Sequence, residues 1–219
     1  MSASESTNPL VEFWFEFASQ YSYLSVMRID HAARVAGVRI AWRPFLLGPI
    51  FHSFGWSTSP FVLQKEKGAY MWRDLERQCR KYSLPWRRPS EFPRRSVLPA
   101  RIALLGLDRP WVSPFAQEIM LANFAHDQDI ASESVVRSVL ERLALPAGQL
   151  LKEAQSDANK GRLRTATEEA QRRGIFGAPT FFVGDEMFWG NDRLEDALEC
   201  AGSTAAAGMT ANANIMRSP

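Results

Sequence analysis

Ser19 is the first residue whose type and position suggest chemistry. It lies between a segment of alternating apolar residues, 11–17, and a segment with helical spacing that starts at Tyr23. In an open α/β sheet, ligands bind at the carboxyl ends of strands. A helix that begins there offers unpaired N–H groups and the positive end of its dipole, which would stabilise an anion such as a thiolate. The sequence leaves open the alternative that Ser19 only caps the helix.

A second candidate is the pair Ala178 and Pro179, within the segment Gly177-Ala178-Pro179-Thr180. A proline directly before a strand either stiffens a turn or forms a cis peptide bond. A cis bond would turn the backbone of Ala178 toward a bound ligand. A trans proline would be an ordinary turn residue, and both interpretations stay open.

A third candidate segment, Trp189-Gly190-Asn191-Asp192, stands at the start of the last predicted helix. Helix N–H groups suit a carboxylate, and the carboxylate of Asp192 suits an ammonium group. The segment would therefore fit a ligand that carries both, such as the terminus of an amino acid. Asp192 and Glu195 also fit a capping box, so capping of the helix is the competing interpretation.

The elements that must position these residues mix strand and helix at both ends of the chain. Strands are predicted at 11–17 and 38–42, on either side of a helix that Gly37 ends. A loop rich in Gly, Pro and aromatic residues is predicted at 45–60. The predicted elements after it are helices at 68–82, 98–107, 114–125, 132–143, 146–157 and 160–173, a hairpin of strands at 180–183 and 187–189, and a helix at 192–201.

This order predicts an α/β fold, namely a thioredoxin-like sheet whose two halves are separated by an all-helical insertion. The thioredoxin-like domain is predicted over 10–58 and 159–203, and the helical insertion over 59–158. Residues 204–219 show no periodicity and are predicted to form a flexible tail.

Charge and cysteine content exclude several classes of function. The 219 residues include 26 basic and 24 acidic side chains, a balance that favours neither nucleic acid nor a membrane as a partner. Cys79 and Cys200 are the two cysteines, so a disulfide scaffold and a cysteine-built metal site are excluded and no metal is expected. Residues 1–9 do not have the pattern of a secretory signal, and we expect a soluble, cytoplasmic protein.

Four short motifs occur in a characteristic order. They are Phe15-Glu16-Phe17-Ala18-Ser19-Gln20-Tyr21-Ser22-Tyr23, Trp42-Arg43-Pro44-Phe45, Gly174-Ile175-Phe176-Gly177-Ala178-Pro179 and Phe188-Trp189-Gly190-Asn191-Asp192-Arg193. Together they resemble the signatures of the 2-hydroxychromene-2-carboxylate isomerase family, which is similar to kappa-class glutathione transferases and DsbA-like oxidoreductases. The resemblance implies a glutathione-dependent cis–trans isomerase of aromatic-degradation intermediates that works by transient addition of the glutathione thiolate. It also implies a homodimer.

The resemblance implies roles for individual residues. Ser19 matches the family serine beside the glutathione sulfur, at the place where a DsbA-like oxidoreductase has the first cysteine of Cys-x-x-Cys. Because Ser19-Gln20-Tyr21-Ser22 contains no thiol, dithiol–disulfide exchange is excluded here, but the Ser19 hydroxyl could donate to a glutathione thiolate and lower its pKa. Ala178 and Pro179 match the pair that binds the cysteinyl unit. Residues 189–192 match the segment that holds the γ-glutamyl end.

The residues expected to meet the substrate depart from the family pattern. His52 and Arg95 stand nearest to a family Lys and Asn, and Trp56 belongs to an aromatic loop that could form a pocket for a small aromatic substrate. A solvated His52 and aromatic rings that only pack the insertion are the alternatives. The pairs Arg87-Arg88 and Arg94-Arg95 are interpreted as solvated surface, or else as a gate for an acidic substrate.

Two other functions stay open at this point. A broader kappa-like glutathione transferase would use the same serine and the same glutathione site. A non-catalytic thioredoxin-fold binding protein would need neither.

Overall fold

A computed structural model describes the backbone of residues 8–215 and the side chains of residues 8–204. The elements follow in the order β1 (Leu10–Phe15), α1 (Gln20–Ala36), β2 (Arg39–Pro44), α2 (Leu47–Ser53), α3 (Pro60–Leu63), α4 (Lys65–Lys81), α5 (Val97–Leu105), α6 (Val112–Phe124), α7 (Glu133–Arg142), α8 (Ala147–Ala154), α9 (Asp157–Arg172), β3 (Thr180–Val183), β4 (Glu186–Trp189), a 3₁₀ turn η1 (Asn191–Arg193) and α10 (Leu194–Ile215).

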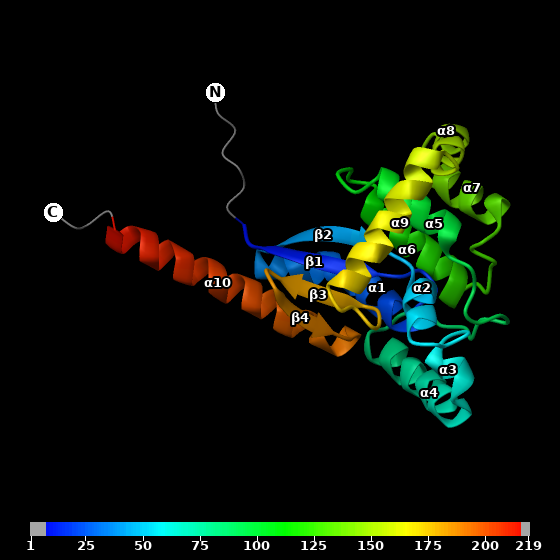
Figure 1. Ribbon diagram of the computed structural model, residues 1–219, viewed down its shortest axis with the longest axis horizontal. Helices are drawn as coiled ribbons and strands as arrows, with labels where there is room; N and C mark the ends of the chain where they lie inside the picture. The colour runs from blue at the N-terminus through cyan, green and yellow to red at the C-terminus, as the bar shows by residue number, and fades with distance from the viewer. Residues whose placement is uncertain (1–7, 216–219) are drawn as a thin grey trace.

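The four strands form one mixed sheet in the order β2-β1-β3-β4 (Figure 1). β1 pairs in parallel with β2, as a crossover through α1 requires, and antiparallel with β3. β3 and β4 form the predicted antiparallel hairpin. This sheet, with the eight helices α2 to α9 between β2 and β3, confirms the predicted thioredoxin-like fold.

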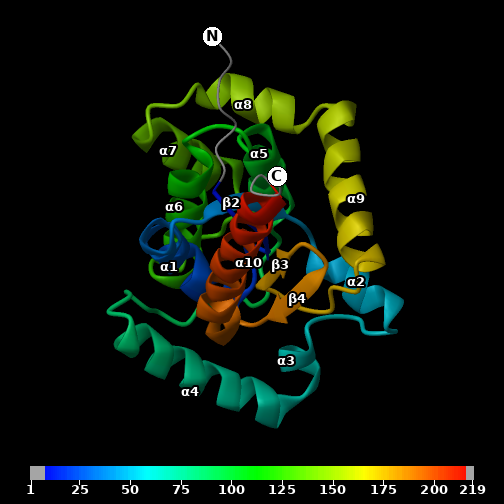
Figure 2. The ribbon, with the colours of Figure 1, turned by 90° about the vertical axis from the view of Figure 1, so that its left-hand side faces the viewer.

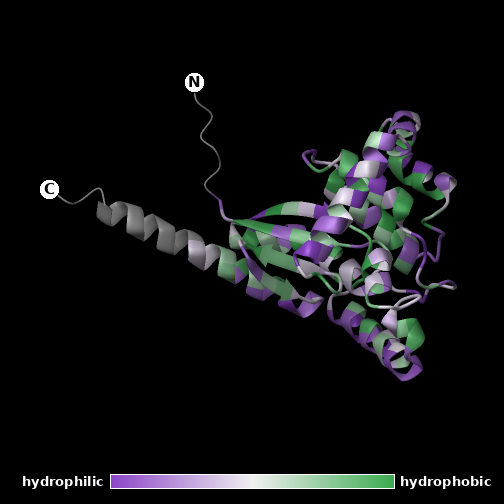
Figure 3. Cartoon of the chain, in the orientation of Figure 1, coloured by the Kyte–Doolittle hydropathy of each residue, from purple (hydrophilic) through white to green (hydrophobic). Residues whose placement is uncertain are grey.

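Helices cover both faces of the sheet. Because side chains alternate along β1, successive residues pack against opposite faces. Phe13 and Phe15 pack into the larger core together with Tyr23 of α1 and Leu194 of α10. Trp14 points the other way, into a smaller cluster that α2 and α9 complete. Much of the sheet is hydrophobic, whereas α4 and α9 carry many hydrophilic residues (Figure 3).

The helices between the two halves of the sheet are tied to the β1–α1 connection. Asn123 of α6 donates from Nδ2 to the carbonyl of Phe17 at 3.1 Å, and the Tyr23 hydroxyl donates to the carbonyl of Pro85 at 2.6 Å. The short helix α3 and the longer α4 form a pair at the opposite end of the molecule from α8 (Figure 2). The loop that precedes α1 is therefore held from two sides.

Two local predictions are wrong. Residues 45–60 are not a continuous loop, because α2 forms at Leu47–Ser53, where Gly48 and Pro49 occupy its first turn and Ile50 is fully buried. The last helix begins at Leu194 rather than at Asp192, after a 3₁₀ turn whose N-cap is Gly190 and which has no side-chain cap. The predicted capping box is absent: Asp192 pairs with Arg193, and Glu195 pairs with Arg28.

The boundaries of two further elements differ from the sequence-based ones. β1 ends at Phe15, since the next residues turn and the Ser19 N–H binds the carbonyl of Glu16 at 3.0 Å. α10 continues to Ile215, although a tail without structure was predicted from residue 204; its alanine-rich composition has a high helix propensity. Residues 216–219 of that predicted tail lie outside the described part of the chain. Among the described helices, none has both the length and the apolar character needed to cross a bilayer.

Candidate active site

The Ser19 hydroxyl connects the start of α1 to the segment before β3. Ser19 is the N-cap of α1, and its Oγ accepts a hydrogen bond from the Ser22 N–H at 3.2 Å. The same hydroxyl donates to the carbonyl of Ala178 at 2.8 Å. The structure therefore brings together two of the candidate segments. The Ser19 hydroxyl makes two hydrogen bonds, and capping of α1 accounts for only one of them.

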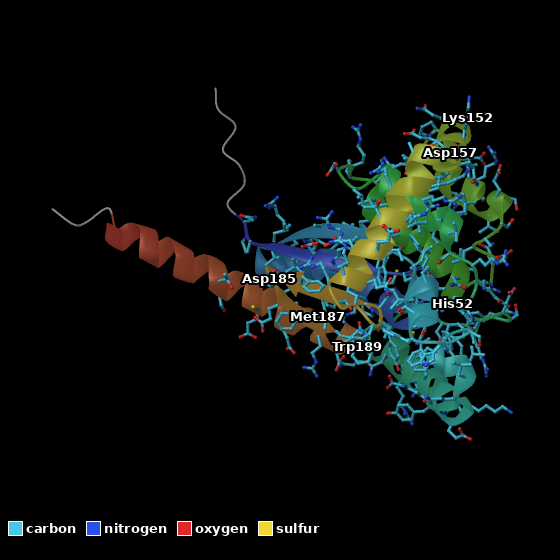
Figure 4. The ribbon with its side chains drawn as sticks, viewed as in Figure 1. His52, Lys152, Asp157, Asp185, Met187 and Trp189 are labelled. Atoms are coloured by element: carbon cyan, nitrogen blue, oxygen red, sulfur yellow. The ribbon has the colours of Figure 1, made fainter. Side chains whose placement is uncertain are left out.

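The peptide bond between Ala178 and Pro179 is cis. The Trp189 indole lies against this segment, because a Cβ added at Gly177 would come within 2.4 Å of Trp189 Nε1. Trp189 also packs edge-to-face on Phe176, with ring centroids 4.7 Å apart, and remains 52% exposed (Figure 4). Glycine at 177 is thus what allows an exposed aromatic ring to cover the backbone beside Ala178.

The third candidate segment is anchored to the same end of α1. Asn191 is buried, and its Oδ1 accepts hydrogen bonds from Ser25 Oγ at 3.2 Å and from Arg28 Nη1 at 2.9 Å. Arg28 also pairs with Glu195 and lies over the ring of Tyr82. The side chains of Ser25 and Arg28 belong to the site as its support. Their sequence positions, at helical spacing after Ser19, were the only signal that could have identified them.

Two residues flank Asn191: Gly190, whose backbone only glycine can adopt, and Asp192, whose carboxylate is exposed. Gly190 has φ +114, and a Cβ there would come within 2.5 Å of Asp192 Oδ1, so only glycine fits at this position. The Asp192 side chain is 73% exposed, and its pairing with Arg193 is a surface ion pair. The carboxylate of Asp192 is therefore accessible to a cationic group of a ligand.

A buried carboxylate, Glu16, lies below the loop that carries Ser19. Its oxygens accept hydrogen bonds from the Ser96 hydroxyl and from the Ala18 N–H, and the Ser22 hydroxyl accepts one from its backbone N–H. Burial raises the pKa of Glu16 from 4.5 to about 7, against the two bonds to its side chain, which lower it. Glu16 was not selected from the sequence, where it falls on the same side of the 11–17 alternation as Glu12 and Trp14.

The protein has no thiol of its own at the start of α1. Residues 19–22 contain no cysteine, and Cys79 of α4 is buried. Burial raises the pKa of the Cys79 thiol to about 12, so it stays protonated at neutral pH. Within the described residues, no group of three metal-binding side chains is found.

The three residues predicted to meet a substrate form no hydrogen bond or ring contact with one another in residues 8–204. His52 is exposed on α2, well separated from Trp189 (Figure 4). Trp56 packs on Phe51 and Phe54, and Arg95 is exposed next to the buried Arg94. None of His52, Trp56 and Arg95 lines the cavity described next, so their substrate roles stay predictions.

A cavity of about 620 Å³, called here the Trp72 pocket, opens between the α3–α4 pair and the connector that leads to α5. Its lining residues are Phe61, Val62, Trp72, Arg88, Pro89, Ser90 and Phe92. The Phe61 ring lies 6.2 Å from that of Tyr21, so the pocket borders the first turn of α1. Trp72 was not among the candidate site residues selected from the sequence.

The Trp72 pocket combines aromatic walls with one cation. Phe92 packs edge-to-face on Trp72 at 4.8 Å, and the Arg88 guanidinium lies 5.2 Å from the Trp72 ring centroid. Arg88 is exposed and forms no ion pair with any side chain in residues 8–204. A planar molecule with a negative charge would match this lining.

Comparisons with known proteins agree with this geometry. The family model of the DSBA-like thioredoxin domain matches residues 10–199. A 2-hydroxychromene-2-carboxylate isomerase from Sphingobium xenophagum is 32% identical over 84% of this chain and 94% of its own length. Glutathione S-transferase kappa 1 from Rattus norvegicus is 22% identical over 85% of this chain and 88% of its own.

A solved structure of a 2-hydroxychromene-2-carboxylate isomerase superposes with a TM-score of 0.78 at 26% identity, covering 96% of this chain and 100% of that one. With the sequence matches, this similarity extends over both halves of the sheet and the helices between them. The chain therefore belongs to the 2-hydroxychromene-2-carboxylate isomerase family of DSBA-like thioredoxin proteins.

Proposed function

We propose that this protein is a glutathione-dependent cis–trans isomerase of aromatic-degradation intermediates. The observation that carries the proposal is the Ser19 hydroxyl, which stands at the start of α1 and binds the carbonyl of Ala178. A hydroxyl in this position can stabilise an anion but cannot exchange disulfides. The nucleophile must then come from another molecule.

Glutathione, when bound, supplies the thiolate that the protein lacks at residues 19–22. The first turn of α1 favours negative charge at this point, and Ser19 can donate its proton to a sulfur once it releases Ala178. The cis Ala178–Pro179 bond fits a ligand backbone, and Trp189 would cover it. These features fit the cysteinyl part of the tripeptide.

The γ-glutamyl end of glutathione carries one ammonium and one carboxylate group. The accessible carboxylate of Asp192 suits the ammonium group, and the backbone of the η1 turn suits the carboxylate. Asn191 is fixed by Ser25 and Arg28, so this part of the site is formed before a ligand arrives.

The Trp72 pocket would hold the aromatic substrate, with Arg88 facing its carboxylate. This assignment is an alternative to His52 and Arg95, the cationic partners expected from the sequence, whose roles no observation tests. Arg88→Gln should raise KM for a chromene carboxylate by about tenfold, the effect of one charge-assisted hydrogen bond. Arg95→Gln, a neighbour outside the pocket, should leave KM unchanged.

The test is the interconversion of 2-hydroxychromene-2-carboxylate and its ring-opened isomer, followed by absorbance with and without glutathione. Isomerisation that requires glutathione and leaves its concentration unchanged supports the proposal. Equal rates with and without glutathione, or no heat of binding in calorimetry at millimolar glutathione, would refute it.

A kappa-like transferase is the second candidate, because kappa-class relatives match over most of the chain. It would use the same glutathione site but release a conjugate, so chromatography of the reaction mixture separates the two activities. We also propose that the protein acts as a homodimer in the cytoplasm. Sedimentation and cell fractionation test these two points.

A further inference from the structure

A second cavity lies on the face of the sheet that α9 covers, and we call it the α9 groove. Its volume is about 600 Å³, and its walls come from β1, β2, α9 and the end of α5. Ser19, Ala178 and residues 189–192 are not among its lining residues, nor are those of the Trp72 pocket. The groove is therefore separate from the site described above. Figures 1 and 2 show α9 running alongside the sheet.

The charges of the α9 groove are unbalanced. Glu12 lies between two arginines, with Oε2 3.1 Å from Arg43 Nε and Oε1 2.8 Å from Arg173 Nη1. Two guanidinium groups thus share a single carboxylate. The second acid of the lining, Glu169, is paired with Arg172 of its own helix.

A third guanidinium adds to this excess from the opposite wall. Arg162 of α9 donates from Nη2 to the carbonyl of Leu104 at 2.7 Å. Within residues 8–204 it forms no ion pair, so a neutral carbonyl is its only protein partner in the groove. Guanidinium groups in such a setting bind carboxylates strongly, because each offers several N–H donors in a fixed plane.

The remaining lining of the α9 groove is largely apolar. Trp14 is buried at its base, and Pro44, Leu104 and Leu107 belong to its walls. The Nε1 of Trp14 is buried and has no hydrogen-bond partner in the described residues. Since buried donors are nearly always paired, a small rotation of this ring toward the groove would give its N–H an acceptor on a ligand.

We propose that the α9 groove binds a small organic carboxylate whose apolar ring packs near Trp14 and whose carboxylate faces Arg162 and Arg43. The volume favours a small molecule, because cavities of about 300 to 1,000 Å³ are typical of such ligands. A segment of another protein chain would need a longer surface. The proposal stands apart from the proposed function, since it involves neither glutathione nor Ser19.

The experiment uses the full chain and 2-naphthoate as the probe. The indole ¹H–¹⁵N resonance of Trp14, identified by its loss in Trp14→Phe, is followed during a titration. A saturable shift supports the proposal, and neutral 2-naphthamide should bind at least tenfold more weakly. An unmoved Trp14 resonance would overturn it, as would a shift produced by raising the protein concentration alone, which would mean that a second copy fills the groove.

Matched variants on one helix identify the cation. Arg162→Gln should weaken naphthoate binding by about tenfold, the effect of one charge-assisted hydrogen bond. Arg164→Gln, an exposed residue of α9 outside the lining, should not. Arg162→Lys should retain part of the affinity, because it keeps the charge but not the planar set of donors, and this separates loss of charge from loss of folding. Arg88→Gln should leave the Trp14 titration unchanged, because the Trp72 pocket is a different site. Equal affinities for Arg162→Gln and Arg164→Gln would overturn the assignment.

Discussion

Replacing Ser19 by alanine should destabilise the fold as well as the site. The change removes the N-cap of α1, which accepts from Ser22 N, and a cap of this kind contributes about 1 kcal/mol. It also removes the donor to the buried carbonyl of Ala178, which costs about 1 to 2 kcal/mol because that oxygen loses its partner. We therefore expect a total loss of about 2 to 3 kcal/mol, and a fall in Tm of roughly 4 to 12 °C for a chain of this size.

Ser156→Ala is the matched control for this experiment. Ser156 caps α9 by accepting from the Asn159 N–H at 3.2 Å, and its hydroxyl makes no bond to a distant segment of the described chain. Urea unfolding monitored by circular dichroism should show a loss of about 1 kcal/mol for this variant. Equal losses for Ser19→Ala and Ser156→Ala would show that the bond to Ala178 contributes nothing and would refute the reasoning.

Four further predictions test the surroundings of the site and the Arg94–Asp127 pair. Gly190→Ala should cost about 1 to 3 kcal/mol in urea unfolding, because φ is +114 and the new Cβ would lie 2.5 Å from Asp192 Oδ1; an unchanged midpoint would contradict the geometry. The pKa of Glu16 is raised to about 7 by burial, so the folded protein holds its proton where the unfolded one has lost it, and stability should fall as pH rises from about 4.5 to above 7. Unfolding at pH 5 and pH 8 should show that Glu16→Gln reduces this slope, and an equal slope would exclude Glu16 as its source. Arg94→Met should lower the free energy of unfolding in urea, because it removes the cation paired with Asp127 and the hydrogen bonds that Arg94 donates to Asn123. Hydrogen bonds from the Ser90 N–H and Arg94 lower the pKa of Asp127 to about 2 in the folded protein. The stability that Asp127 contributes to the wild-type protein should therefore be lost as pH falls below about 4, in an acid titration followed by fluorescence.

Local patterns in the sequence predicted the elements that local interactions determine. Val11, Phe13 and Phe15 alternate with polar or larger neighbours, and all three are fully buried in the larger core. Gly37 has φ +67 and ends α1, as a helix terminus in the left-handed conformation requires. Hydrophobic periodicity and the glycine and proline residues that end elements are visible within a few residues of sequence. The strands, most helices and the position of Ser19 could therefore be predicted.

The features that the sequence did not predict depend on distant partners. α2 forms over a Gly-Pro pair because Ile50 is buried in the cluster that also holds Ala170 of α9. Glu195 does not join a capping box because Arg28, 167 positions earlier, takes its carboxylate. Glu16 lies beyond the end of β1, and it is buried where its carboxylate accepts a hydrogen bond from Ser96 of the helical insertion. In each case the deciding contact joins segments that are far apart along the chain.

The two interpretations of Ser19, a helix cap and a partner for a thiolate, use different parts of one hydroxyl. The cap uses a lone pair of Oγ, which accepts from Ser22 N, whereas the bond to Ala178 uses the single proton. A thiolate would compete for that proton alone, so α1 could keep its cap while a ligand binds. The exchange replaces a neutral hydrogen bond by a charge-assisted one, which is roughly twice as strong. A serine that already donates to Ala178 is thus held in place for a thiolate, and the stronger bond to sulfur would offset the loss of its bond to the Ala178 carbonyl. A cysteine would instead bring its own sulfur to this position, and with it a different chemistry.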